Sequence, residues 1–359
     1  MPLKSVELWW RRRWITLLVR LMRRSGGGRP DWGSRPYRVL FLRHDRAGDM
    51  ILSTGVMRAI ARSYPTITMD VLASPANAAI IQDADYVNDI IVFDKRATAS
   101  YPSTLLRLRR GRYDAVIDCM VTSPSVTTLL LILASGAKYR VGIAGRGNDA
   151  AFNITVPAET KPHAHMVDLL AALARAFDVD LATSERRPSL TLTAGETSRA
   201  EAIWGSDGAR MLINVSAGTS ERVWPDDNYV AVMRRLRERA SDAVFRVIGA
   251  PNERARAEYV ANNGGGEYAD TPSIRDAFAL VGGADFVFTP DTSIVHAASA
   301  FRVPSVAIYV RGKAEQWGLY DTPGENVEHT EGRLRTLSVD RVLRAVDVVW
   351  DAAAVSRST

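Results

Sequence analysis

Residues 39–52 read VLFLRHDRAGDMIL, an apolar run followed by a polar loop and the start of a helical pattern. The apolar run predicts a buried strand, and the chain then enters a helix through Gly48 and Asp49. A strand-to-helix loop lies at the carboxyl edge of a sheet, where open α/β folds bind ligands. Asp49 is therefore a candidate functional carboxylate at that edge.

Two interpretations of this loop stay open. Asp49 falls where a helix N-cap is expected, so it could do no more than cap the helix. A catalytic role needs an acceptor hydroxyl whose proton the carboxylate removes. His44, Asp45 and Arg46 could likewise form an ordinary solvated turn.

Strand-like and helix-like segments alternate along the chain in two series. Such alternation predicts parallel sheets covered by helices on both faces, that is, two Rossmann-like domains with a substrate cleft between them. The expected strands cover residues 38–43, 67–73, 89–94, 115–121 and 139–144 in the first series and 211–217, 244–250, 285–290 and 305–310 in the second. The expected helices cover residues 50–64, 77–84, 102–111, 126–134 and 163–177, then 227–240, 253–263, 274–284 and 293–301.

The chain divides by composition into a tail and two domains. We expect a basic tail with a Gly-rich linker at 1–35, a first domain at 36–190 and a second at 191–359. Residues 183–200 are polar with little apolar period, and the join between the two domains is expected near residues 185–208. A final helix is expected at 339–353, and the sequence leaves open whether it packs back across the join.

The bulk composition is that of a globular protein, with 47% hydrophobic and 24% charged residues among 359. The net charge of +6 comes from the tail, where nine Lys or Arg face only Glu7 and Asp31. The remainder sums to −1, which argues against a nucleic-acid-binding surface spread over the fold. The lone Cys119 fits a reducing compartment, and no apolar stretch approaches the ~20 residues that span a bilayer.

The tail carries an amphipathic helical pattern. Its apolar positions recur at steps of three and four among arginines, and they are Leu3, Val6, Trp10, Trp14, Leu17, Leu18 and Leu21. One interpretation is a helix that binds an anionic membrane surface through residues 3–24, with tryptophans at headgroup depth. The alternative is a helix docked on the protein's own surface or on a partner. Residues 25–34, SGGGRPDWGS, resemble a flexible tether.

Residues 213–230, INVSAGTSERVWPDDNYV, offer small donors and one cation after a strand. Ser216, Thr219 and Ser220 supply hydroxyls, and Arg222 supplies a guanidinium, a set that suits phosphate oxygens. The alternative is a surface turn. Neither the Walker pattern nor GxGxxG after a strand is present.

Residues 287–301, VFTPDTSIVHAASAF, open a helix with two hydroxyl residues. Thr292 and Ser293 at a helix N-terminus form an anion site, whereas Asp291 would repel phosphate and is better suited to sugar hydroxyls. His296 lies one turn into the helix and could be no more than a packed histidine.

Other signals are weaker. The segment 247–256, VIGAPNERAR, could border a nucleotide base at Gly249. The five histidines show no zinc-like spacing with cysteines or carboxylates, so no metal site is expected. A GxSxG nucleophile elbow is also absent.

An ordered set of motifs resembles glycosyltransferase family nine, the ADP-heptose:lipopolysaccharide heptosyltransferases. The resemblance covers about residues 38–310. Its motifs are AGDMILSTGVMRAIARSYP at 47–65, VNDIIVFD at 87–94, YDAVIDC at 113–119, YRVGI at 139–143, HMVDLLAALARAF at 165–177, VSAGTSERVWP at 215–225 and LVGGADFVFTPDTSIVHAASAFRVPSVAIY at 280–309.

The resemblance implies a GT-B fold, with an acceptor domain first and a nucleotide-sugar domain second, and metal-independent, inverting sugar transfer. It places Asp49 as the catalytic base, with Arg46 and Gly48 on the acceptor side. Donor binding falls to Ser216, Thr219, Ser220, Arg222, Asp291, Thr292, Ser293 and His296. Arg222 stands where the family usually has lysine, which changes the geometry of the cation, and Ser293 stands where glycine is common.

We therefore expect a glycosyltransferase that moves a sugar, most readily heptose from ADP-heptose, to a lipopolysaccharide-type or other cell-surface glycan that is linked to lipid. No cofactor beyond the donor and no nucleic-acid partner is expected. The enzyme would be cytoplasmic, peripheral on the inner face of the membrane. The alternatives are another nucleotide sugar or a protein acceptor on the same fold, or a catalytically idle scaffold that its tail recruits to membranes.

Overall fold

The computed structural model describes residues 13–20, 22, 28–121, 125–145, 149–157, 164–205 and 207–357. The chain divides into two compact units, Met1–Arg186 and Arg187–Thr359. Parts of the tail that the sequence assigns to a helix, residues 3–12, 21 and 23–24, lie outside the described residues, as do residues 25–27 of the linker and residue 163 at the start of an expected helix.

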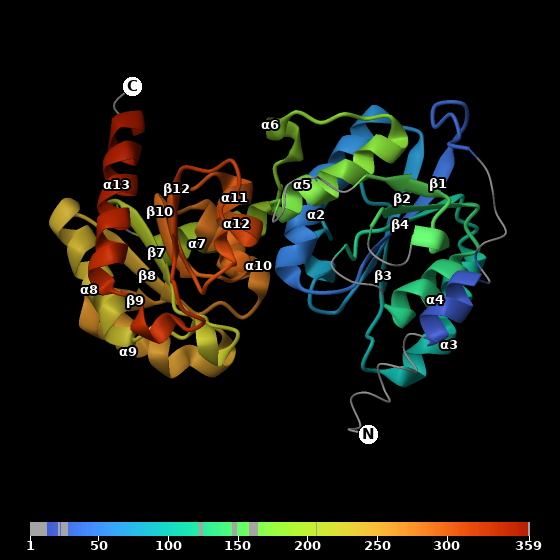
Figure 1. The fold of residues 1–359 in the computed structure, drawn as a ribbon. Helices are drawn as coiled ribbons and strands as arrows, with labels where there is room; N and C mark the ends of the chain where they lie inside the picture. The colour runs from blue at the N-terminus through green and yellow to red at the C-terminus, as the bar shows by residue number, and fades with distance from the viewer. Residues whose placement is uncertain are drawn as a thin grey trace, which may run out of the picture. The chain divides into compact units, whose positions relative to one another are not determined.

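The first unit is built on a six-stranded parallel sheet in the order β3-β2-β1-β4-β5-β6 (Figure 1). This is the order of a doubly wound Rossmann unit, in which the direction of winding reverses between β1 and β4. Its strands are β1 (Tyr37–Arg43), β2 (Ile67–Ala73), β3 (Asp89–Val92), β4 (Ala115–Asp118), β5 (Tyr139–Ile143) and β6 (Ile154–Val156).

The helices of the first unit are α2 (Ala47–Ser63), α3 (Tyr101–Arg110), α4 (Val126–Ser135), α5 (Met166–Ala171) and α6 (Thr183–Arg186), with 3-10 turns η1 (Ala78–Ile80), η2 (Thr98–Ser100), η3 (Asp149–Ala151) and η4 (Ala172–Phe177). Two expected helices are wrong in part. The segment 77–84 keeps only η1, because the Asn77 side chain bonds the backbone of Ser74 and Arg43 and holds a loop. The helix expected to end at residue 177 changes to a 3-10 turn after Ala171.

The described part of the tail, residues 13–20 and 22, is helical and packs on its own unit. Leu18 and Met22 are each 4% exposed and join a core cluster with side chains of α3 and α4, and Ile15 packs against the same cluster. The Arg140 guanidinium donates to the Met22 carbonyl at 2.8 Å. Trp14 and Leu17 remain exposed. Within residues 13–20 and 22, the apolar side chains are therefore divided between the core and the surface.

The linker is anchored rather than loose from residue 29 onward. Trp32 is buried, its indole N–H donates to the Ala176 carbonyl at 2.9 Å, and its ring stacks on Phe177 at 4.3 Å between centroids. Arg29 forms an exposed ion pair with Asp178. The expected flexible tether is wrong for this stretch because one large buried ring outweighs the glycine-rich composition.

The second unit repeats the same topology. Its parallel sheet has the order β12-β11-β10-β7-β8-β9, which is the strand order of the first unit counted from β7 (Figure 1). Winding reverses between β7 and β10. The strands are β7 (Arg210–Asn214), β8 (Val244–Ile248), β9 (Glu267–Tyr268), β10 (Phe286–Pro290), β11 (Ser305–Tyr309) and β12 (Gly324–Glu328).

The helices of the second unit are α7 (Ala194–Trp204), α8 (Asp226–Arg239), α9 (Arg254–Gly264), α10 (Ile274–Gly282), α11 (Ser293–Phe301), α12 (Ala314–Trp317) and α13 (Val339–Arg357), with 3-10 turns η5 (Ser220–Arg222), η6 (Pro251–Glu253) and η7 (Leu334–Thr336). The last helix packs on α8, β11 and β12 through Val342, Val346 and Val349, and an ion pair joins Arg235 to Asp347 at 2.8 Å.

A helix that the sequence pattern did not indicate, α7, lies in the polar segment after the join. Thr193 and Glu196 form a capping box at its start, and Trp204 is fully buried at its end. A buried ion pair joins Glu196 to Arg275 of α10. Caps and a charge pair, rather than apolar periodicity, therefore define this helix.

Among the described residues, no helix has both the length and the apolar character needed to cross a bilayer.

Candidate active site

The candidate residues follow the central strands at which each sheet reverses its winding. In the first unit they lie after β1 and β4, and in the second after β7 and β10. Neighbouring parallel strands end at one edge, and open α/β sheets bind ligands at this switch point. Each unit therefore has its own candidate edge.

Asp49 lies inside the first turn of α2 rather than at its cap. The N-cap is Arg46, which makes no side-chain cap bond, and Asp49 is the third residue of the helix. The expectation that Asp49 is the N-cap is wrong by three residues. Gly48 is also within this turn, so residues 44–46 make the reversal from strand to helix.

Arg43 is the buried cation that organises this edge. Its side chain is 2% exposed and contacts the segment from residue 45 to the start of α2 and the residue that follows β4. It donates from Nε to the Asp49 carbonyl at 3.0 Å and from Nη2 to Asp49 Oδ1 at 3.2 Å. It also donates to the Cys119 carbonyl after β4 and pairs with Asp45 at 3.4 Å. One guanidinium therefore fixes the carboxylate of Asp49 and ties β1 to β4.

Three carboxyl groups at this edge are harder to ionise than usual. Burial raises the pKa of Asp49, the charge of Arg43 opposes the rise, and the neighbouring Asp45 adds to it. Burial likewise raises the pKa of Asp45. At the end of β4, burial raises the pKa of Asp118 to about 6, although the Met120 N–H donates to its Oδ1 at 2.9 Å. A carboxyl group with a raised pKa is suited to exchanging a proton near neutral pH.

The rest of the loop is held by hydrogen bonds. Asn77 donates to the Arg43 carbonyl at 2.9 Å, and the Ser74 hydroxyl donates to the Asp45 carbonyl at 2.8 Å. His44 is buried, 3.4 Å from the Thr128 hydroxyl, and burial lowers its pKa to about 4, so it is neutral at pH 7. The solvated-turn interpretation is therefore wrong for His44.

Asn214, the last residue of β7, organises the edge of the second unit. It is fully buried and donates from Nδ2 to the hydroxyls of Thr289 at 2.9 Å and Thr292 at 3.0 Å. Its Oδ1 accepts from the Ser216 N–H at 3.0 Å. Asn214 thereby ties the loop after β7 to the loop after β10.

Arg222 and Asp291 form an ion pair across these two loops. Arg222 donates from Nη1 to the Asp291 carbonyl at 2.7 Å, and its Nη2 lies 2.9 Å from Asp291 Oδ2. The sequence places both residues at the donor but does not pair them. The pairing offsets the charge of the cation and fixes the plane of its guanidinium, which presents its remaining N–H groups in a set direction.

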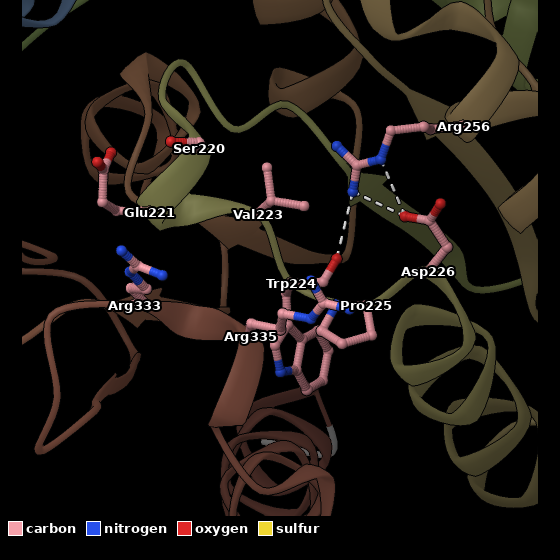
Figure 2. Close-up of a pocket in the computed structure, with 9 residues that line it drawn as sticks. All are labelled: Ser220, Glu221, Val223, Trp224, Pro225, Asp226, Arg256, Arg333 and Arg335. Carbon is pink, nitrogen blue, oxygen red and sulfur yellow. Dashed lines mark hydrogen bonds and ion pairs between the residues drawn. The ribbon is translucent and has the colours of Figure 1, made fainter.

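The loop after β7 splits its hydroxyls between two sides. Ser216 is half-buried beside Asn214, whereas Thr219 and Ser220 are exposed. Gly218 has φ +67°, the left-handed conformation that turns the chain toward η5. Ser220 lines a separate pocket beside η5 (Figure 2). The Ala217 N–H faces the Glu253 carboxylate at 3.2 Å, which brings the weakly indicated segment after β8 to the same edge.

Thr292 caps α11, and its hydroxyl accepts from the Ile294 N–H at 3.3 Å. Ser293 is the first residue of the helix and is half-buried. His296 is 5% exposed, so it is packed within the unit as the alternative interpretation has it. The backbone N–H groups at the start of α11 have the polarity that favours an anion.

Taken separately, one edge offers a positioned carboxylate and the other offers amides, hydroxyls and a cation. The first can take a proton from a hydroxyl, and the second can hold an anion. No group of three or more His, Cys, Asp or Glu side chains arranged to hold a metal ion occurs in the described part of the chain.

Sequence reasoning missed Arg43, Asp118 and Asn214 as members of these edges. Each is the last residue of its strand, namely β1, β4 and β7. A polar residue at the end of an apolar run could have indicated these three positions. The expected strands, 115–121 and 211–217, continued past Asp118 and Asn214, so these two residues fell within the interior of expected strands.

Comparison with known proteins agrees with these observations. The model of glycosyltransferase family 9 (heptosyltransferase) matches residues 104–344. Lipopolysaccharide heptosyltransferase 2 of Salmonella typhimurium is 22% identical over 289 residues, which are 76% of this chain and 82% of that protein. The protein of the same name from Escherichia coli K12 gives the same figures.

Solved structures share the fold. The E. coli ADP-heptose lipopolysaccharide heptosyltransferase II has a TM-score of 0.70 at 19% identity and covers 88% of this chain and 99% of its own. A family 9 glycosyl transferase from Veillonella parvula has a TM-score of 0.74 at 15% identity, with coverages of 89% and 99%. The E. coli heptosyltransferase WaaC with ADP has a TM-score of 0.71 at 18% identity, with coverages of 87% and 99%. The fold is therefore of the GT-B type, and the chain belongs to glycosyltransferase family 9, the heptosyltransferase family.

Proposed function

We propose that this glycosyltransferase moves a heptose from ADP-heptose to a lipopolysaccharide-type acceptor, with inversion at the anomeric carbon. The observation that carries the proposal is the contrast between the two edges: a buried, Arg43-held carboxylate in one unit and an anion-binding helix start beside a fixed cation in the other. The choice of donor and acceptor is supported by the relatives named lipopolysaccharide heptosyltransferase 2 and by the heptosyltransferase structure with ADP.

The proposed reaction is a single displacement. Asp49 takes the proton of the acceptor hydroxyl as that oxygen forms a bond to the anomeric carbon. The bond from this carbon to the diphosphate oxygen breaks, and its electron pair leaves on the nucleoside diphosphate. Arg46 and Gly48 would lie beside the acceptor in this scheme.

The leaving diphosphate is assigned to the second unit. Arg222 and the N–H groups of Thr292 and Ser293 at the start of α11 would stabilise its growing negative charge. Asp291 would accept sugar hydroxyls, and Ser216, Thr219 and Ser220 would line the donor loop, with His296 packed behind it. The mechanism uses no metal or cofactor, because the cation and the helix start supply the positive charge.

A transfer assay tests the function. The chain is incubated with ADP-heptose, other nucleotide sugars and a heptose-free lipopolysaccharide precursor, and products are read by mass spectrometry. We expect ADP release together with a heptose mass added to the precursor. Transfer from a different nucleotide sugar, or to a protein, would replace the substrate assignment, and absence of nucleoside diphosphate binding would favour an idle scaffold.

We further propose that the tail, residues 3–24, holds the enzyme on the anionic inner face of the cytoplasmic membrane. Trp14 and Leu17 are 51% and 47% exposed, and Arg13 and Arg20 lie on the same helix. Deletion of residues 3–24 would also remove the buried side chains of Leu18 and Met22 from the core, so point variants are the sounder test. Trp14→Ala/Leu17→Ala should reduce sedimentation with phosphatidylglycerol vesicles but leave the fold intact; unchanged sedimentation would contradict the proposal.

A further inference from the structure

A pocket of the second unit lies beside η5, the turn whose last residue, Arg222, pairs with Asp291. Its volume is about 530 Å³ (Figure 2). Its walls come from η5, the start of α8, one side chain of α9 and the segment around η7. The lining residues are Ser220, Glu221, Val223, Trp224, Pro225, Asp226, Arg256, Arg333 and Arg335. None of the functional assignments above uses this pocket, apart from Ser220 on its rim.

The floor of the pocket is rigid. Trp224 is fully buried and packs edge to face on Tyr229 at 5.1 Å. Its indole N–H donates to the Leu337 carbonyl at 3.0 Å. Leu334 and Leu337 are buried on either side of the exposed Arg335. The segment that carries Arg333 and Arg335 is thus anchored to the loop that carries η5.

The lining has three arginines against two carboxylates, an excess of one positive charge. Arg256 is already engaged, at 2.7 Å from Asp226 and 3.0 Å from Glu253. Figure 2 shows the Arg333 side chain on the same side of the pocket as Glu221. Arg335 forms no ion pair with any residue that the structure describes. An exposed guanidinium with no carboxylate partner, carried on an anchored backbone segment, is suited to an external phosphate or carboxylate.

The pocket is larger than a bare anion requires, and part of its wall is apolar. Val223 is 36% exposed and Pro225 lies beside it, so a sugar ring can cover these side chains while its charged group meets the arginines. We propose that this pocket binds a phosphorylated or carboxylated saccharide unit of the glycan acceptor, with Arg333 and Arg335 as the contacting cations. This inference rests on the proposed function for the identity of the saccharide.

The pocket shares η5 with the proposed donor edge. Arg222 at the end of η5 pairs with Asp291, while Ser220 and Glu221 of the same turn line the pocket. An occupant would therefore lie one short turn from the site assigned to the donor diphosphate. The reacting hydroxyl of the acceptor stays assigned to Asp49 of the first unit, and the closeness of this pocket to the donor diphosphate is the reason for assigning it to another saccharide unit of the same glycan.

Calorimetry on the full chain tests the inference with glucose 6-phosphate, inorganic phosphate and glucose as probes, each with ADP present to fill the donor edge. We expect glucose 6-phosphate to bind more tightly than phosphate, and glucose not to bind. Arg333→Ala/Arg335→Ala should weaken glucose 6-phosphate at least about tenfold. Arg341→Ala, an exposed arginine of α13 outside the pocket, should change nothing.

Three results would overturn the inference: wild-type affinity in the double variant, equal affinity for glucose and its phosphate, or equal affinity for free phosphate. Loss of ADP affinity in the double variant would also overturn it, because the pocket would then belong to the donor. A failure of the donor proposal is recognised by a different measurement: the unaltered chain would then not bind ADP. In that case the same titrations are repeated without ADP, and the same outcomes decide.

Discussion

The two units use residues of different charge to join the ends of the two central strands of their sheets. In each, the last residue of the strand beside the switch point is buried and bridges to the neighbouring strand: Arg43 of β1 reaches the Cys119 carbonyl, and Asn214 of β7 reaches Thr289. The bridging residue is a cation in the first unit and a neutral amide in the second. The cation collects carboxylates around it, whereas the amide leaves its edge open to an anionic ligand.

This difference teaches that the topology fixes where a site lies, and the residue that ends the strand sets its charge. Both sheets have the same strand order. The carboxylates near Arg43 would be too costly to bury without it. Around Asn214, by contrast, the carboxylates of Asp291 and Glu253 are matched by Arg222 and Arg256. The following substitutions either break this contrast or measure its size.

The largest effect is expected from Asp49→Asn. The amide keeps the shape of the side chain but cannot accept a proton, so turnover should fall by about 10²–10⁴-fold. Affinity for ADP should not change. Asp180→Asn is the matched control, since its side chain is 88% exposed in the same unit. Normal turnover by Asp49→Asn in the mass-spectrometric assay would reduce Asp49 to a helix-terminus residue.

Arg43→Met should destabilise the first unit by about 3–5 kcal/mol, because it leaves buried carboxylates without their cation. Hydrogen exchange should quicken in peptides of β1 and β4 and stay unchanged in β7 and β10, which serve as an internal reference. Arg107→Met removes an exposed ion pair with Asp89 and should cost under about 1 kcal/mol. If hydrogen exchange in β1 and β4 of the Arg43 variant were as slow as in the unaltered chain, Arg43 would not organise this edge.

Asp118 predicts a pH dependence of stability. Its folded-state pKa of about 6 lies above the ordinary value of 3.8, so the protonated form is the one the fold tolerates better. Stability from this group therefore rises as pH falls through about 6 and levels off below about 4. Asp118→Asn should gain up to about 3 kcal/mol at pH 7.5, from a shift of about two pKa units. Denaturant titrations at both ends of this range should show that gain shrink toward acid; a constant difference would contradict the assignment.

The smallest effect is expected at Asp291. Asp291→Asn removes the carboxylate opposite Arg222 and frees the guanidinium for phosphate, so ADP should bind about fivefold more tightly. The advantage of ADP-heptose over ADP should shrink, because the sugar loses an acceptor for its hydroxyls. Competition binding of the two ligands measures both changes. A weaker affinity for ADP would contradict this, because fixing the guanidinium of Arg222 would then contribute more to phosphate binding than the competing carboxylate takes away.

The sequence was most informative where apolar runs and strand-end loops coincide. The strands expected around residues 38–43 and 211–217 are β1 and β7, and the fold class is confirmed. The expected strands missed β6, β9 and β12, which lie at the edges of the two sheets and are short or polar. Very short or polar strands leave a weak pattern, whereas the apolar edge strand β3 was expected at 89–94.

The contacts within each edge could not be predicted from residue types alone. Nothing in the order of residues shows that Arg43 turns back onto Asp49, or that Arg222 meets Asp291 from a loop many residues away. The contacts of the tail could not be predicted from its sequence either. Its helical period was clear, but burial of Leu18 and Met22 depends on the surface that α3 and α4 provide.

Calorimetric titration of ADP into Asp49→Asn and Arg222→Ala tests the division of labour most directly. The account predicts that Asp49→Asn binds ADP as the unaltered chain does, and that Arg222→Ala binds it at least about tenfold more weakly. The reverse pattern, with ADP affinity lost at Asp49 and kept at Arg222, would contradict it.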